Sequence, residues 1–75
     1  MDIAKLCIKL EKGPVYLKDD YEDAVLRIIS TGQGAKHYLK RRGRKEIEVP
    51  SSDKDIFEMT MNGHEISKKE YDRFI

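Results

Sequence analysis

The single cysteine of this chain, Cys7, constrains the fold most, because a domain of 75 residues without an internal disulfide must rest on a small apolar core. Hydrophobic residues make up 39% of the sequence and charged residues another 39%, so core-forming residues are few. The apolar positions are still regularly spaced, which is not typical of a disordered chain. We expect one domain, residues 1–75, in which short amphipathic elements share the core.

The N-terminal segment and the cysteine content predict a cytoplasmic protein. Asp2, Lys5 and Lys9 interrupt the apolar region that a signal peptide would need. A lone cysteine is typical of a reducing compartment. No apolar run approaches the roughly 20 residues that span a bilayer, so we expect no membrane partner.

The first segments of the chain predict a β-hairpin. Within residues 3–11 every second residue is apolar, and these are Ala4, Leu6, Ile8 and Leu10. A period of two predicts a half-buried strand. Gly13 permits a tight turn, so residues 14–17 are expected to return as the second strand.

Residues 19–31 carry the pattern of an amphipathic helix. Asp19 and Glu22 resemble a capping box at its start, and Gly32 would end it. The spacing i, i+3, i+4, i+7, i+8 predicts one buried stripe, made of Tyr21, Ala24, Val25, Ile28 and Ile29.

The second half of the chain predicts two further hairpins and a short helix. One hairpin is expected at 35–41/44–49 and the other at 56–61/64–66, where Asn62-Gly63 is a typical type I′ turn. Ser67 and Glu70 form a capping box for a helix at 68–75, with Ile66 and Tyr71 as a hydrophobic staple. The sequence therefore predicts an α+β fold, with a small antiparallel sheet of short hairpins packed on the helix at 19–31.

Residues 36–45, here called the basic run, are the strongest candidate for a binding site. No acidic residue occurs from Ala24 through Lys45, so that span carries +7, and the rest carries −6 because the whole chain carries +1. Clustered like charges indicate either a solvated face or a bound anion. The candidate binding residues are Lys36, His37, Tyr38, Lys40, Arg41, Arg42, Arg44 and Lys45.

The geometry of this second hairpin leaves two interpretations open. A two-residue turn at Arg42-Gly43 would place Arg41 opposite Arg44 and Lys40 opposite Lys45, and like charges directly opposite destabilise a strand pair. Either the turn is longer, or the tip is kept for binding an anion. Tyr38 and His37 could stack on bases, which makes nucleic acid the alternative to an acidic protein partner.

No motif predicts a catalytic residue, a metal site or a cofactor. Cys7, His37 and His64 lack paired ligand spacing, and Asp53 and Asp55 fall short of a calcium loop. The Gly32–Gly34 pair follows a predicted helix rather than a strand. Self-association is expected, if anywhere, through an apolar patch at the C-terminus that comprises Tyr71, Phe74 and Ile75.

The segment from Gly13 to Asp20, with Val15-Tyr16-Leu17 at its centre, and the Ser30-Thr31-Gly32 that ends the predicted helix resemble small accessory proteins of bacteriophages and prophages. The resemblance covers roughly the first half of the chain and transfers no site residue. It implies a non-enzymatic protein that binds and modulates a host factor, including inhibitors of bacterial defence systems.

The leading expectation is therefore a small non-enzymatic binding protein of phage or mobile-element type, which acts by stoichiometric binding to a host or defence protein. The alternative is a nucleic-acid-binding module that uses the basic run.

Overall fold

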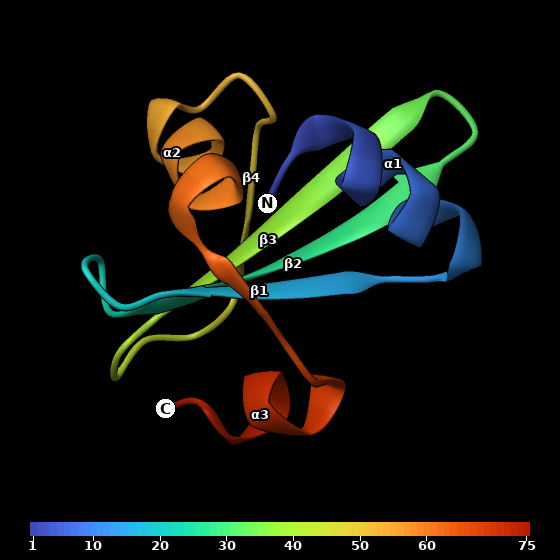
Figure 1. The fold of residues 1–75 in the computed structure, drawn as a ribbon. Coiled ribbons are helices and arrows are strands. Elements are labelled where there is room, and N and C mark those ends of the chain that lie inside the picture. Colours follow the sequence, from blue (N-terminus) through green and yellow to red (C-terminus); the bar gives the residue numbers. More distant parts are fainter.

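The computed structural model describes all 75 residues as a five-stranded antiparallel sheet with helices on both faces (Figure 1). The strands follow the order β4-β3-β2-β1-β5 across the sheet. The elements are α1 Ile3–Lys12, β1 Val15–Asp19, β2 Ala24–Thr31, β3 Gly34–Arg41, β4 Ile47–Val49, α2 Lys54–Asn62, β5 His64–Ile66 and α3 Lys68–Arg73. The predicted α+β class is confirmed. None of the helices is long and apolar enough to cross a membrane.

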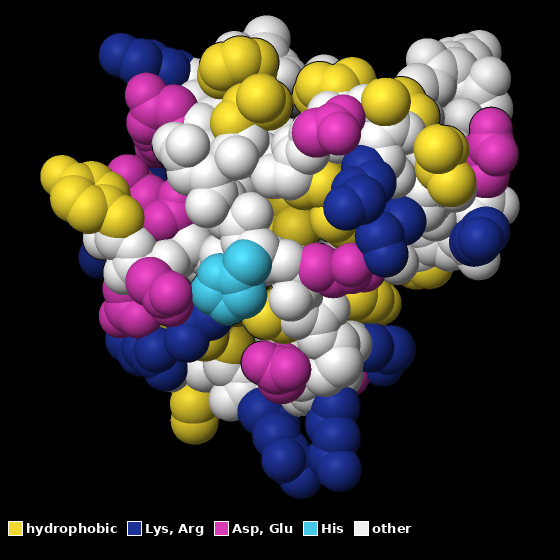
Figure 2. Space-filling view, in the orientation of Figure 1, with side chains coloured by type: hydrophobic (Ala, Val, Ile, Leu, Met, Phe, Trp, Pro, Cys, Tyr) yellow, Lys and Arg dark blue, Asp and Glu magenta, His cyan; other side chains and the backbone are white.

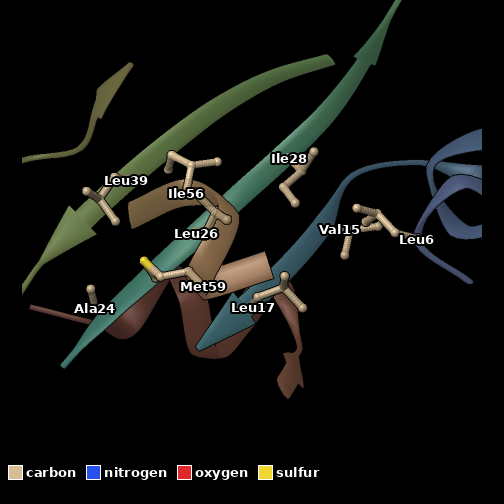
Figure 3. Packing of buried hydrophobic residues seen from close by; sticks show 9 residues of the cluster. All are labelled: Leu6, Val15, Leu17, Ala24, Leu26, Ile28, Leu39, Ile56 and Met59. Carbon is tan, nitrogen blue, oxygen red and sulfur yellow. The ribbon is translucent and has the colours of Figure 1, made fainter. Parts of the chain in front are cut away.

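The larger core lies between the sheet and the helices α1 and α2 (Figure 3). The two helices contribute Leu6, Ile56 and Met59, and the strands contribute Val15, Leu17, Ala24, Leu26, Ile28 and Leu39. Most of the strand residues alternate along their strands, so one face of the sheet supplies them. Burial of this apolar surface is the main stabilising contribution to the domain.

The smaller core lies on the opposite face, under α3. It consists of Val25, Ile66, Tyr71 and Phe74, and Tyr16 packs against it. The rings of Tyr16 and Tyr71 are 5.2 Å apart in a tilted arrangement. A helix of six residues is too short to be stable alone, so this contact with the sheet holds α3 in place.

Several predicted elements are confirmed. Strands occur where they were expected around residues 14–17, 35–41 and 64–66, and the C-terminal helix is present as α3. Ser67 caps α3 by accepting a hydrogen bond from the N–H of Glu70 at 3.1 Å. Ile66 and Tyr71 lie in the same core, as a hydrophobic staple requires.

The strand predicted at residues 3–11 is wrong, because this segment is the helix α1. Its apolar residues fit the strand period of two and also the helical period of 3.6. In the helix, Leu6 and Leu10 lie one turn apart and face the core, while Ile8 points to solvent. The side chain of Asp2 decides the start, since it accepts hydrogen bonds from the N–H groups of Ala4 and Lys5.

The helix predicted at residues 19–31 is also wrong, because most of this segment is the strand β2. Asp19 accepts hydrogen bonds from the N–H groups of Tyr21 and Glu22, as a helix cap would, but these bonds close a turn. The chain reverses at Asp23, whose φ is +50°. A strand buries Leu26 beside Ile28, whereas the predicted helix stripe leaves Leu26 out.

The hairpin predicted at 56–61/64–66 is wrong in its first half, which is the helix α2. Asp53 caps this helix through a 2.8 Å hydrogen bond from the N–H of Asp55. Met59 is buried, whereas Phe57 and Met61 face solvent because the period is that of a helix. Gly63 ends α2 with a φ of −72°, so Asn62-Gly63 is not a type I′ turn.

The core predicts a large difference between two isoleucine substitutions. Ile28 is fully buried in the larger core, so Ile28→Ala should lower the free energy of unfolding by about 2–4 kcal/mol. Ile8 is 57% exposed on α1, so Ile8→Ala should change it by less than about 0.5 kcal/mol. Urea denaturation of both variants measures the difference, and equal effects would contradict the assignment of Ile28 to the core.

Gly63 predicts a second stability effect, for a reason different from turn geometry. A Cβ at this position would lie 2.6 Å from the carbonyl oxygen of Met59 and 3.1 Å from that of Lys18. Gly63→Ala should therefore destabilise the domain by about 1–3 kcal/mol, because backbone atoms must move. Gly32→Ala is the control, since nothing lies within 4 Å of its Cβ. Thermal unfolding that ranks the two variants the other way would refute the close approach.

Candidate functional site

The strand β3 splits the basic run between the two faces of the sheet. Successive side chains of a strand point to opposite faces, so Lys36, Tyr38 and Lys40 share the face that α3 covers in part. Lys40 confirms this placement, because its Nζ donates a 2.7 Å hydrogen bond to the carbonyl oxygen of Tyr71. His37 and Arg41 lie on the other face. The structure therefore does not gather the eight predicted residues into one patch.

Two arginines of the run are held by carboxylates from other segments. Arg41 lies 3.4 Å from Glu22 and 3.1 Å from Asp55, and Arg42 lies 2.9 Å from Asp23. The hydrogen bond from Arg42 lowers the pKa of the Asp23 carboxyl. Figure 2 shows basic and acidic side chains in contact at the lower left, where Lys and Arg lie against Asp and Glu. These two arginines tie the β1–β2 turn to the β3–β4 turn.

Tyr38 is covered by a cation that does not belong to the run. The guanidinium of Arg27 lies 4.3 Å from the centre of the Tyr38 ring, and the same group binds Glu46 at 2.6 Å. One face of the ring is therefore occupied within the chain itself. Arg27 and Glu46 were not predicted at this site, because Arg27 meets Tyr38 only through the strand register and Glu46 reaches the ring only through its ion pair with Arg27.

The remaining cations of the run are Lys36, Arg44 and Lys45, and none of them has an acidic partner within the chain. Arg44 and Lys45 belong to the segment between β3 and β4. Gly43 adopts a φ of +73° there, and the N–H of Arg44 bonds to the carbonyl oxygen of Arg41 at 3.0 Å. The strand pairing ends at Leu39 and Ile47, so the turn is longer than two residues and the opposed like charges are avoided.

This longer turn encloses a hollow of about 360 Å³, lined by Leu39, Arg41, Arg44, Lys45 and Ile47. Leu39 and Ile47 are opposite each other in the strand register and supply apolar surface. Ile47 is 56% exposed. The hollow thus combines apolar surface with two unpaired cations, which suits an acidic ligand that also carries apolar groups.

His37 is a structural residue rather than a contact residue. Only 8% of this residue is exposed, and its Nδ1 has no hydrogen-bond partner. Burial lowers the pKa of this imidazole, because the charged form is poorly solvated inside the domain. Its predicted role as a base-stacking residue is incompatible with this position.

The C-terminal apolar patch expected to support self-association is not present as a surface. Tyr71 and Phe74 are buried against the sheet, and only Ile75 is exposed. Four large apolar side chains are exposed on α1 and α2, which form the upper part of Figure 2, and they are Ile3, Ile8, Phe57 and Met61. Ile47 of β4 is exposed as well, and so is Tyr21, which was expected in the buried stripe of residues 19–31.

No group of three or more His, Cys, Asp or Glu side chains is arranged to hold a metal ion. Cys7 is free and exposed on α1. Comparison of the chain with protein-family models, with curated proteins and with solved structures finds no match.

His37 predicts a pH-dependent stability. Below its ordinary pKa of 6.5 the unfolded chain binds a proton at His37, whereas the folded chain resists it. The free energy of unfolding should thus be fully retained above that pH and should fall as the pH decreases below it. Asp23 and Asp72, whose pKa values lie below 3.8, do not titrate in this window.

Urea denaturation between about pH 7.5 and 5 measures this dependence. His37→Gln should flatten the pH profile, whatever its effect on stability at neutral pH. His64→Gln is the matched control, because His64 is exposed on β5. A profile that stays steep in His37→Gln would assign the titration to other groups.

Proposed function

We propose that this chain is a small non-enzymatic protein that binds an acidic protein surface stoichiometrically, through the hollow at the β3–β4 turn. The observation that carries the proposal is the pair of unpaired cations, Arg44 and Lys45, beside exposed apolar surface from Ile47. A protein interface combines apolar contact with complementary charge in this way. The resemblance to phage accessory proteins supports a host or defence protein as the partner, in the cytoplasm.

The charge distribution favours a protein partner over nucleic acid. Binding to a phosphate backbone needs a continuous series of free cations, whereas Lys40, Arg41 and Arg42 are engaged within the chain. The ring of Tyr38, the candidate for base stacking, already contacts Arg27. Lys36 lies on strand β3, apart from the turn that carries Arg44 and Lys45. These contacts leave a small basic site rather than a groove.

Charge reversal at the hollow tests the proposal. Arg44→Glu/Lys45→Glu should fold normally, because exposed unpaired charges contribute little to stability. It should weaken partner binding by about tenfold or more, since repulsion replaces attraction. The measurement is affinity capture from a nuclease-treated bacterial lysate, followed by titration of the purified captured partner.

Lys5→Glu/Lys12→Glu is the matched control, because it makes the same change of charge at two exposed lysines of α1. It should bind like the original chain. Equal loss in both variants would indicate a non-specific dependence on net charge. Capture that disappears on nuclease treatment, together with retention on heparin, would instead favour the nucleic-acid alternative.

A further inference from the structure

The strand β4 is an open edge of the sheet. It is the terminal strand in the order β4-β3-β2-β1-β5 and pairs with β3 over only three residues, Ile47–Val49. Its outer backbone N–H and C=O groups therefore have no strand partner. Such an edge can accept a further strand from another chain.

The opposite edge of the sheet, β5, is more protected. Glu65 at its centre is held by Lys9 of α1 at 2.8 Å, and Ile66 is buried beneath α3. Helices thus approach β5 from both faces. The strand β4 is less covered, since Ile47 and Glu48 are exposed and only Val49 packs against the larger core. If a partner strand is added to this sheet, β4 is the edge that can receive it.

The side chains that β4 and the preceding turn present differ between the two faces of the sheet. Ile47 lies in register with Leu39 and lines the hollow, where Arg44 and Lys45 supply positive charge. Glu48 lies in register with Tyr38, on the opposite face, and is the only charged side chain of β4. It forms no ion pair, and Lys36 of β3 lies on the same face. Side chains of an added strand also alternate between faces. The edge therefore discriminates between the two faces of the incoming segment.

We propose that the partner binds by adding an extended segment to β4 as a sixth strand. This segment carries acidic and apolar side chains on the face toward the hollow, and a basic side chain on the face toward Glu48. Main-chain hydrogen bonds would supply affinity, and the two charged faces would supply register and specificity. The proposal rests on the proposed function, because the hollow is the same site.

Two probe peptides of identical composition test this mode of binding. The matched peptide has six residues. Leucine and glutamate occupy the alternate positions whose side chains face the hollow, and threonine and lysine occupy the positions between them, whose side chains face Glu48. In the swapped peptide, glutamate and lysine exchange places, so lysine faces the hollow and glutamate faces Glu48. The matched peptide should bind about tenfold more tightly by isothermal titration calorimetry, because two cross-strand charge pairs reverse their sign.

The reversed surface provides the decisive control. The variant Arg44→Glu/Lys45→Glu/Glu48→Lys exchanges the charges of the two faces at exposed positions, and it should prefer the swapped peptide by a similar factor. A matched peptide that is N-methylated at alternate residues, on the edge facing β4, should lose binding at least about tenfold, because it cannot donate main-chain hydrogen bonds. Amide hydrogen exchange should show added protection at 47–49 only with the unmethylated matched peptide.

The outcomes separate this proposal from the proposed function. Equal binding of the matched and swapped peptides, binding that survives N-methylation, or no binding of any peptide would each overturn strand addition. If capture of the protein partner still depends on Arg44 and Lys45, the acidic-surface function stands and only its mode is wrong. If that capture is also insensitive to both residues, the proposed function fails as well.

Discussion

The central strand β2 is the constraint on which the rest of the structure depends. Its residues Ala24, Val25, Leu26 and Ile28 are completely buried, although successive side chains point to opposite faces of the sheet. A strand in this position needs a cover on both faces, which α1 and α2 provide on one and α3 on the other. The domain thus divides its few apolar residues between two thin cores, and β2 contributes side chains to both. A small helix such as α3 is essential for this reason.

The ion pairs around the turns join separate segments of the chain at its surface. Arg41 and Arg42 connect the β3–β4 turn with carboxylates of the β1–β2 turn and of α2. The pairs of Arg41 are partly buried and that of Arg42 is exposed, so each contributes little by itself. Together they neutralise the middle of the basic run and leave Arg44 and Lys45 free at its end. The strong separation of charge in the sequence therefore becomes a small, directed basic site in the fold.

The sequence predicted the α+β class, the strands β1, β3 and β5, and the cap of α3. These features depend on residues close in sequence, such as turn and cap residues, or on an apolar pattern that fits one period only. The prediction failed at α1, β2 and α2, where the apolar residues fit a period of two and a period of 3.6 about equally well. Burial on both faces decides β2, and that depends on contacts distant in sequence, such as those with Tyr71 and Phe74. The hollow depends on register, because Leu39 meets Ile47 only once the strands have paired. Composition identified the basic run but not which of its cations are free.

The edge at β4 is the proposed binding surface and also a terminal strand that the sheet must protect from unwanted pairing. Natural sheets protect their edges with short strands and charged residues, and β4 has both, with Lys45 and Glu46 before it and Glu48 within it. Such protection discourages identical chains from pairing through β4. If two copies paired about Glu48, their carboxylates would lie opposite each other and repel. It does not discourage a segment with the complementary arrangement of charges. In the proposed mode of binding, the residues that protect the edge against self-association are also the ones that would select the partner.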